Sequence, residues 1–493
     1  MPVPPRAETR PTTLSAHGED RVDPYYWLRD RDDPAVLAHL RAENEYLDAA
    51  LADQAPLANA IYEEIKSRVV ETDTSVPVRH GPWWYFGRTR QDLSYPISCR
   101  APATPGDDPP VVDPDRGLDG EQVILDQNVE AEGHDFLSVG VLDVSPDHSW
   151  VAVGVDHDGY ERYRVTIRPL AGQAGVDDVI DDIYYGFAWA NDNAHVFYTR
   201  VDDAMRPFQV WRHRLGTATD DDVLVLQEDD AQFSLGVGRS RDDAVVLFVA
   251  GSSTTTEARA IDANRPADQP ATIEPRRKGV EYALEHLTDR RGAKWWLMLT
   301  NDGATDFRLL ARHEHDGEWR ELIAERPGTR LDGVDAFAGF LAVSERLDGA
   351  NAVRVVPLLD ADDPLGSDLL ERSWLIDGPA SPSTIGLGGN AEHDTDRLRV
   401  AMTSMVTPAL VADVDLSTRE RVVRKQQPVR GYDAARFSTG RLWATASDGR
   451  RVPVTVVARA DLVNAGGATL EPREPMPLML YGYGSYETSI DPY

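Results

Sequence analysis

The stretch Val141-Leu-Asp-Val-Ser-Pro-Asp-His-Ser-Trp-Val-Ala-Val-Gly-Val-Asp156 places two apolar runs on either side of a short polar turn. Ser145-Pro-Asp-His148 predicts the turn, because Pro and Asp favour turn conformations, and Trp150 to Val155 predicts the second strand. A further turn at His157-Asp-Gly159 leads to an alternating run from Tyr163 to Ile167. This segment therefore predicts consecutive antiparallel strands joined by tight turns.

Units with the same pattern recur: an apolar strand, a turn rich in Asp, Asn or Gly, a second apolar strand, and a strand that ends in charged residues. The units begin at Val76, Val141, Phe187, Phe233, Leu284, Leu331 and Ile385. Their starts are 65, 46, 46, 51, 47 and 54 residues apart. A period of roughly 40–50 residues with several short strands is typical of β-propellers. We therefore predict a mainly β fold with a seven-bladed β-propeller over residues 73–427. A large sandwich or two stacked β domains is the alternative, which the regular spacing disfavours.

Residues 1–72 have a helical pattern that the repeats lack. Asp33 and Pro34 predict a helix start, with Asp as the N-cap and Pro at the first helical position, and Pro56 predicts a second start. Apolar residues recur at helical spacing after both starts: Leu37, Leu40, Leu47 and Leu51, then Leu57, Ile61, Ile65 and Val69. These apolar faces need a partner, which the short-stranded repeats are not expected to supply.

Residues 428–493 have a third pattern. Arg441 to Ala446 and Arg451 to Ala458 predict two strands joined at the Ser447-Asp-Gly449 turn. The short apolar run Pro477-Leu-Met-Leu-Tyr481 predicts a strand buried on both faces, as in a parallel α/β sheet. Such a strand needs neighbours on both edges and helices on both faces. We therefore expect residues 428–493 to be the start of an α/β domain that either is truncated here or is completed by a partner.

The bulk composition restricts the class of protein. Hydrophobic residues make up 41% of the 493 residues, and no run of about 18 apolar residues predicts a membrane span. The N-terminus lacks the pattern of a secretory signal, which predicts a cytoplasmic protein. Lys and Arg number 51 against 83 Asp and Glu, a net charge of −32, so nucleic acid is not an expected partner. The negative charge could attract basic peptides, although solubility is the plainer explanation.

Single reactive residues give no catalytic or metal site. The only cysteine, Cys99, lies in a strand-like run, so we expect a buried packing role. His313 and His315 are close in sequence, as are His148 and His157, but neither pair has metal-ligand spacing with a third residue. We interpret all twelve histidines as solvated surface residues, and we expect no metal and no cofactor.

Several motifs together resemble one family of serine peptidases. Three motifs lie in the middle of the chain: Gln209-Val-Trp-Arg-His213, Thr254-Thr-Thr-Glu-Ala-Arg259 and Pro275-Arg-Arg-Lys278. Tyr25-Tyr-Trp-Leu-Arg-Asp30 precedes the helices, and Pro477-Leu-Met-Leu-Tyr-Gly-Tyr-Gly-Ser-Tyr486 precedes Ser489-Ile-Asp-Pro492. In order and spacing they are similar to prolyl oligopeptidase relatives, the middle three to the oligopeptidase B branch.

The resemblance implies an architecture for the three zones. It implies that residues 1–72 pack on a C-terminal α/β-hydrolase domain, that the propeller at 73–427 restricts access to the active site, and that 428–493 begin the hydrolase domain. The rest of that domain would be the missing structural partner of the helices. Cleavage of short peptides after Arg or Lys is likewise implied by resemblance alone, with its acidic determinants beyond residue 493.

The catalytic residues of such an enzyme are absent from this sequence. The nucleophilic Ser lies in a G-x-S-x-G turn, followed later by Asp and His, and no such turn occurs in the 493 residues. We therefore expect the chain by itself to be inactive. By resemblance, Tyr483 is the candidate oxyanion-hole donor, although packing is the plainer reading of a tyrosine there. Tyr486 is the candidate substrate-binding aromatic.

Two other classes of function stay open. A free-standing propeller could be a binding module or an inactive pseudo-peptidase. A related exopeptidase of the same superfamily is a third possibility, although the lack of a predicted membrane anchor argues against the dipeptidyl peptidase IV type.

Overall fold

The computed structural model describes residues 2–170, 178–315, 317–379, 382–466 and 469–493. The chain divides into two compact units: residues up to 70 together with 429–431, and residues 71–428 together with 432–493. No helix among the described residues is long and apolar enough to cross a membrane.

The first unit contains a β-hairpin and two helices. Its elements are β1 (Thr12–Ala16), β2 (Glu19–Asp23), η1 (Tyr26–Arg29), α1 (Pro34–Leu51), η2 (Ala52–Gln54) and α2 (Ala55–Arg68). The hairpin, which the sequence did not predict, turns at His17 and Gly18, both with positive φ. Arg10 joins this hairpin to the helices, because its guanidinium lies 4.2 Å from the Trp27 ring and 3.5 Å from Asp33.

Both predicted helix starts are confirmed. The carboxylate of Asp33 accepts a 2.8 Å hydrogen bond from the backbone N–H of Ala35, which caps α1, and Pro56 lies in the first turn of α2. The apolar residues predicted for the two helices are all exposed, from 39% for Leu37 to 63% for Leu57. The rest of this unit therefore does not cover the apolar faces of its helices.

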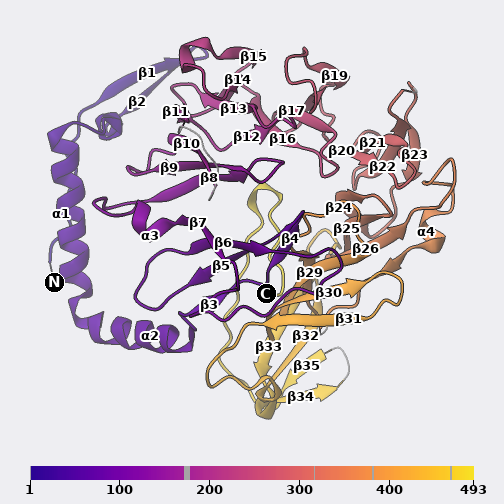
Figure 1. The fold of residues 1–493 in the computed structure, drawn as a ribbon. Coiled ribbons are helices and arrows are strands. Elements are labelled where there is room, and N and C mark those ends of the chain that lie inside the picture. The colour runs from indigo at the N-terminus through magenta and orange to yellow at the C-terminus, as the bar shows by residue number, and fades with distance from the viewer. Residues whose placement is uncertain (1, 171–177, 316, 380–381, 467–468) are drawn as a thin grey trace. The chain divides into compact units, whose positions relative to one another are not determined.

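The second unit is a seven-bladed β-propeller, as predicted (Figure 1). Blade one contains β3 (Asp73–Thr74), β4 (Val78–His80), β5 (Trp83–Thr89), β6 (Ile97–Pro102) and β7 (Gln122–Asp126), followed by α3 (Gln127–Glu130). Blade two contains β8 (Ser138–Val144), β9 (Trp150–Asp156), β10 (Tyr163–Pro169) and β11 (Asp178–Ile183). Blade three contains β12 (Phe187–Trp189), β13 (His195–Val201), β14 (Pro207–Arg214) and β15 (Val223–Gln227), with η3 (Thr219–Asp221). Blade four contains β16 (Ser234–Arg239), β17 (Val245–Gly251), β18 (Thr256–Asp262) and β19 (Ala271–Glu274).

The remaining three blades have the same antiparallel order. Blade five contains β20 (Tyr282–Thr288), β21 (Lys294–Thr300), β22 (Arg308–His313) and β23 (Arg320–Ile323). Blade six contains β24 (Thr329–Phe337), β25 (Phe340–Leu347), β26 (Ala350–Pro357) and β27 (Trp374–Leu375), with α4 (Leu369–Arg372). Blade seven contains β28 (Thr384–Leu387), β29 (Arg397–Ser404), β30 (Thr407–Asp415) and β31 (Arg421–Gln426). All strands of each blade are therefore contiguous in sequence.

The repeat in the sequence arises from one type of turn between the first two strands of a blade. In blades two, three and four, the carboxylates of Asp147, Asp192 and Asp242 accept a backbone N–H from two residues further on. The next residue adopts positive φ: 59° at His148, 55° at Asn193 and 57° at Asp243. Asp favours such turns because its side chain replaces a backbone acceptor.

Neighbouring blades pack through apolar side chains. Clusters of buried residues join blade one to two, two to three, three to four, four to five, five to six, and six to seven. Phe197 and Phe248, for example, meet edge to face across the joint between blades three and four, with ring centroids 5.4 Å apart. Since apolar burial is worth roughly 25 cal/mol per Å², these joints are the main source of stability.

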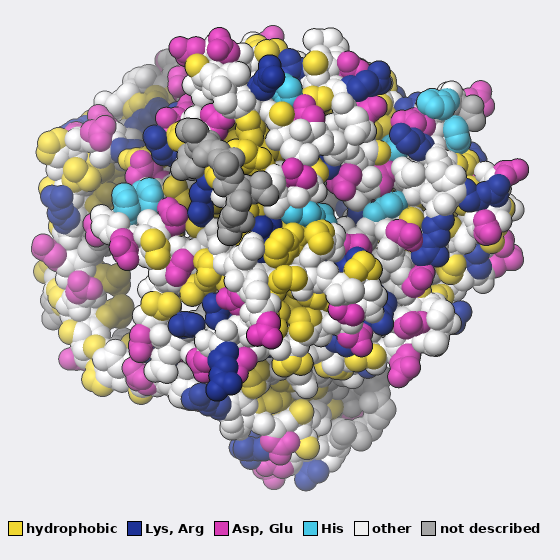
Figure 2. Space-filling view, viewed as in Figure 1, with side chains coloured by type: hydrophobic (Ala, Val, Ile, Leu, Met, Phe, Trp, Pro, Cys, Tyr) yellow, Lys and Arg dark blue, Asp and Glu magenta, His cyan; other side chains and the backbone are white. Residues whose placement is uncertain are grey.

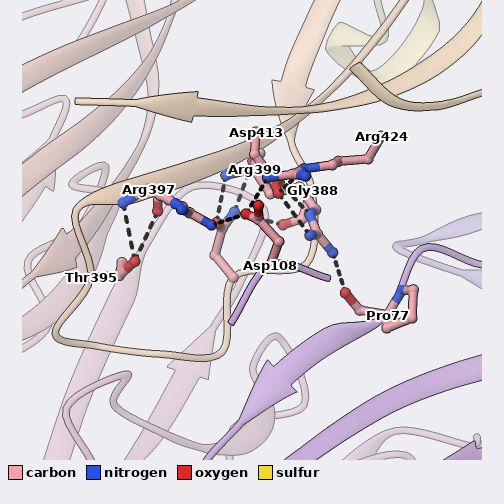
Figure 3. A network of polar contacts seen from close by, with 9 residues as sticks. Pro77, Asp108, Gly388, Thr395, Arg397, Arg399, Asp413 and Arg424 are labelled. Carbon is pink, nitrogen blue, oxygen red and sulfur yellow. Dashed lines mark hydrogen bonds and ion pairs between the residues drawn. The ribbon is translucent and has the colours of Figure 1, made fainter. Parts of the chain in front are cut away.

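Polar contacts join blade seven to blade one (Figure 3). Arg399 donates to the carboxylate of Asp413 at 2.7 Å and to the backbone oxygen of Pro77 at 2.7 Å, and Arg424 reaches the same Asp413 at 2.8 Å. Lys425 pairs with Asp73 at 2.6 Å. We call this set of contacts the closing seam. Gly389 lets the backbones approach there, because a Cβ at this position would lie 2.6 Å from a methyl group of Val78.

The residues after the propeller form two hairpins and an irregular segment. The predicted hairpin is confirmed as β32 (Phe437–Thr445) and β33 (Arg451–Arg459), preceded by η4 (Ala434–Arg436). It is followed by η5 (Ala460–Leu462), β34 (Val463–Gly466), β35 (Thr469–Pro472) and η6 (Ser485–Glu487).

The strand predicted for 477–481 is wrong, because these residues are irregular and pair with no strand. Leu478, Met479 and Leu480 are 82%, 87% and 80% exposed. A buried parallel strand requires neighbours on both edges, and none of the strands in the described part of the chain pairs with this segment.

Candidate functional site

A cavity of about 380 Å³ lies where the first strands of several blades end. His80 at the end of β4, Asp143 on β8 and Glu285 on β20 contribute to its wall. Arg239 and Arg241, at the end of β16 and just after it, contribute two positive charges. We call this the central cavity, since it is lined by blades one to five and seven.

The two arginines of the central cavity already have partners. Arg239 donates to Asp243 at 2.7 Å and to the backbone oxygen of Trp189 at 2.6 Å. Arg241 contacts Asp335 of blade six and the backbone oxygen of Asn390 of blade seven. Because Arg241 itself belongs to blade four, it connects blades that are not neighbours in the ring.

Asp143 and Glu285, which both line the cavity, have no ion pair among the described residues. Burial raises the pKa of Asp143 to about 6, an effect that Arg239 only partly offsets. Burial, with a smaller contribution from Asp335, raises the pKa of Glu285 to about 8. Desolvation disfavours the charged form of a carboxyl group, so a cation in the cavity would relieve this cost.

The loop between β28 and β29, residues 388–396, extends from blade seven to four other blades. Its Glu392 accepts from the backbone N–H of Gly81 at 2.7 Å, in blade one, and Asn390 accepts from Arg241 of blade four. His393 contacts the backbone oxygen of Thr288 at 2.7 Å, in blade five, and the His393 oxygen accepts from Ala338 of blade six at 3.0 Å. This loop therefore lies across one end of the ring and narrows access to its centre.

The outer surface is less able than the central cavity to distinguish a charged ligand from a neutral one. Figure 2 shows acidic and basic side chains interspersed over the visible face. Ion pairs such as Arg164–Asp181, with side chains 61% and 65% exposed, are typical of this surface. Charge recognition is therefore expected where carboxyl groups lack partners, in the central cavity.

Comparison with known proteins identifies the fold family. The family model described as prolyl oligopeptidase, N-terminal beta-propeller domain, matches residues 4–427. This chain belongs to the prolyl oligopeptidase family. Dipeptidyl aminopeptidase BI of Pseudoxanthomonas mexicana is 35% identical over 99% of this chain and 66% of its own length. Protease 2 of Moraxella lacunata is 32% identical over 99% of this chain and 67% of its own length.

Solved structures of the prolyl oligopeptidase family agree. Oligopeptidase B from Leishmania major superposes with a TM-score of 0.88 at 29% identity, covering 99% of this chain and 68% of that one. Oligopeptidase B from Trypanosoma brucei, in a closed form with covalently bound antipain, gives 0.87 at 31% identity, covering 99% and 69%. The present chain thus spans about two thirds of the length of these relatives and carries the propeller of an oligopeptidase B-like protein.

The two residues predicted for the active site, Tyr483 and Tyr486, do not line the central cavity. Tyr483 lies in the irregular segment before η6 and is 52% exposed. Tyr486 is 96% exposed and has a positive φ of 54°. The roles of both residues stay predictions.

The prediction for the histidines of this propeller is wrong in part. His213 and His286 are fully buried and His148 is 9% exposed. His213 lies 2.6 Å from Asp222, and His286 lies 2.6 Å from Asp242. Burial by itself would raise the pKa of Asp242, but the contact with His286 and the hydrogen bonds from Ser240 and Thr288 together lower it. A paired carboxylate thus permits burial of a ring that would otherwise be solvated.

Cys99 is 1% exposed, as predicted, and burial raises the pKa of its thiol to about 11. Sequence reasoning missed Asp143 and Glu285 of this family propeller. A signal was present in the sequence, because Asp143 and Glu285 each follow a Leu within the apolar part of a predicted first strand.

Proposed function

We propose that this chain is the N-terminal portion of an oligopeptidase B-like serine endopeptidase that cleaves short peptides after Arg or Lys. In this proposal the propeller restricts access to the active site, so that folded proteins are excluded. The observation that supports binding of basic peptides is the pair of carboxyl groups, Asp143 and Glu285, which line the central cavity and have no ion pair among the described residues. The acidic residues that select Arg or Lys at the cleavage point would lie in the rest of the hydrolase domain.

The same proposal assigns the parts outside the propeller. Residues 1–72 would pack on an α/β-hydrolase domain that residues 428–493 begin, which supplies a partner for the exposed apolar faces of α1 and α2. Tyr483 would donate its hydroxyl to the oxyanion, a contribution of roughly 3 kcal/mol in comparable sites. Tyr486 would contact the substrate. We also propose a cytoplasmic location, which fractionation of the expressing cells would test.

Binding of a small cation tests the basic-peptide preference. N-acetyl-argininamide should bind the 493-residue chain in calorimetry, and N-acetyl-glutaminamide, which lacks the charge, should not. The double variant Asp143→Asn/Glu285→Gln should weaken binding by about tenfold, as expected for loss of charged hydrogen-bond acceptors. Binding at pH 7 should release protons, since a bound cation favours the ionised form of Glu285.

The matched control is Asp203→Asn, which changes an exposed carboxylate on the loop after β13. It should leave binding unchanged. Equal binding of the charged and neutral probes, or full binding by the double variant, would remove the support for basic peptides.

Peptide hydrolysis tests whether catalysis requires the proposed catalytic domain in addition to this chain. The purified chain should not cleave an Arg-Arg fluorogenic substrate, because no G-x-S-x-G turn occurs in it. Turnover that a serine-directed inhibitor abolishes would contradict this expectation.

A further inference from the structure

The segment after β35 is exposed except at one point. From Glu471 to Ile490 every side chain that the structure describes is exposed, whereas Asp491 is half-buried and Pro492 is buried. Tyr483 lies in this segment, eight residues before Asp491. What holds Asp491 therefore ties the C-terminal end of the segment to the rest of the chain, as the contacts of Arg473 with Leu462 and Val463 tie its start.

Asp491 is held by the hairpin of β25 and β26 in blade six. Arg346 donates to its two carboxylate oxygens at 2.6 and 3.2 Å, a bidentate contact. Asn351 pairs directly with Arg346 across the hairpin, and its amide, correctly oriented, donates to the same oxygens at 3.0 and 3.1 Å. Bidentate pairs of this kind are stronger and more directional than single contacts.

The Arg346–Asp491 ion pair is largely shielded from water, and a second carboxylate lies on the other side of the guanidinium. The Arg346 and Asp491 side chains are only 19% and 17% exposed. Asp332, on the neighbouring strand β24, lies 3.7 Å from the guanidinium of Arg346 on the side away from its two terminal nitrogens. An exposed ion pair contributes little, but these features distinguish Arg346–Asp491 from that class.

The turn of the same hairpin also contacts β32 and β33. Arg441 of β32 donates to the backbone oxygen of Asp348 at 2.9 Å. Gly349 has a φ of 79°, and a Cβ there would lie 3.0 Å from Arg441 and 3.3 Å from Pro453. One hairpin of blade six thus contacts both the β32–β33 hairpin and the C-terminal end of the chain.

We propose that the β25–β26 hairpin is the anchor that fixes the Tyr483 segment against the propeller, with Arg346 as its positioning residue. The functional meaning of this anchor rests on the proposed role of Tyr483. The anchor would set where the phenol hydroxyl lies relative to the ring, since Asp491 is tied to blade six only eight residues after Tyr483. Arg346 itself touches no reacting group.

Hydrogen exchange of the full 493-residue chain tests the anchor. Arg346→Met and Asp491→Asn should each raise amide exchange in peptides covering 484–493 by about tenfold, the effect of losing a charged hydrogen bond. The charge-swapped variant Arg346→Asp/Asp491→Arg should restore a large part of the protection. A merely destabilised propeller would exchange faster in all blades and would not be rescued.

Arg164→Met is the matched control, because it breaks a 2.8 Å pair with Asp181 on the surface of blade two. It should leave exchange in 484–493 unchanged. Unchanged exchange in Arg346→Met, or a swapped variant no better protected than the single variants, would overturn the anchor. Hydrogen exchange is independent of peptide binding and of the role of Tyr483. The anchor can therefore be disproved while the proposed function stands, and the proposed function can be disproved while the anchor stands.

Discussion

The joints between successive blades and the closing seam are built from different side chains. Each joint from blade one through blade seven contains an apolar cluster. Among the described residues, no such cluster joins blade seven back to blade one, where Arg399 contacts Pro77 and Lys425 pairs with Asp73 instead. Since every blade is contiguous in sequence, no strand is shared across the seam either.

This difference separates overall stability from local opening. Apolar burial stabilises without directional requirements, so the successive joints should unfold together. A buried ion pair loses much of its Coulombic gain to desolvation, and so it contributes specificity more than net stability. We therefore expect the apolar joints to set the global stability of the propeller and the seam to set where the ring opens first.

The largest effect is expected from breaking an apolar joint. Phe248→Ala removes a side chain that is 1% exposed and that packs on Phe197 of the neighbouring blade. The free energy of unfolding should fall by about 3–5 kcal/mol, measured by urea denaturation. Leu224→Ala is the control, because Leu224 on β15 is 42% exposed, and it should lower the free energy of unfolding far less. A loss below about 1 kcal/mol would contradict the importance of the joint.

A smaller and more local effect is expected at the seam. Arg399→Met leaves Asp413 with Arg424 alone and removes the donor to Pro77, which should cost about 2–3 kcal/mol. Hydrogen exchange should rise chiefly in 76–81 and 388–399. Phe248→Ala should instead raise exchange in all seven blades, because it lowers the global stability. If both variants gave the same exchange pattern, the distinction between seam and joints would be lost.

The sequence predicted the blades better than the seam, for a physical reason. Strand alternation and the Asp-rich turns are local, so the first three strands of blade two could be predicted from residues 141 to 167 alone. The contact of Arg399 with Pro77 joins residues 322 positions apart, and no periodicity signals it. The central carboxylates were visible as Asp143 and Glu285 in apolar strands, but their lack of partners depends on which blades meet.

The predicted strand at 477–481 also shows that a local sequence pattern does not determine long-range contacts. Its apolar run is a true local signal for burial, yet the strand forms only where neighbouring strands are present. The buried histidines show it too. His286 becomes compatible with the core only because Asp242, 44 residues earlier, lies beside it.

Replacing a carboxylate of the central cavity, which lies between the blades of both classes of contact, adds a pH dependence to the comparison. Glu285 has a folded-state pKa of about 8, above the ordinary value of 4.5. The folded state therefore binds the extra proton between these values, and stability falls as the pH rises from about 4.5 to about 8. Asp335, Asp242 and Arg241 are the charged groups that face it.

Glu285→Gln cannot ionise, so it should match the unmodified chain at pH 5 and exceed its stability at pH 9. We expect a gain of about 2 kcal/mol there, less than the full shift implies because part of the side chain contacts cavity water. Urea denaturation at both values of pH measures it. A gain of equal size at pH 5 would indicate a packing effect rather than relief of a desolvated charge.

The smallest effect is expected where the seam reaches solvent. Asp108 pairs with Arg397 and with Arg424 at 2.9 Å, and these contacts lower its pKa, but its side chain is 62% exposed. Asp108→Asn should leave the denaturation midpoint unchanged within error, because exposed pairs are screened by water and salt. Urea denaturation of Arg399→Met and Asp108→Asn at low and high salt separates the buried contacts of the seam from the exposed ones. Only the variant at the buried Arg399 should retain its effect at high salt, and a large effect of Asp108→Asn at any salt would place the closing interaction at the surface instead.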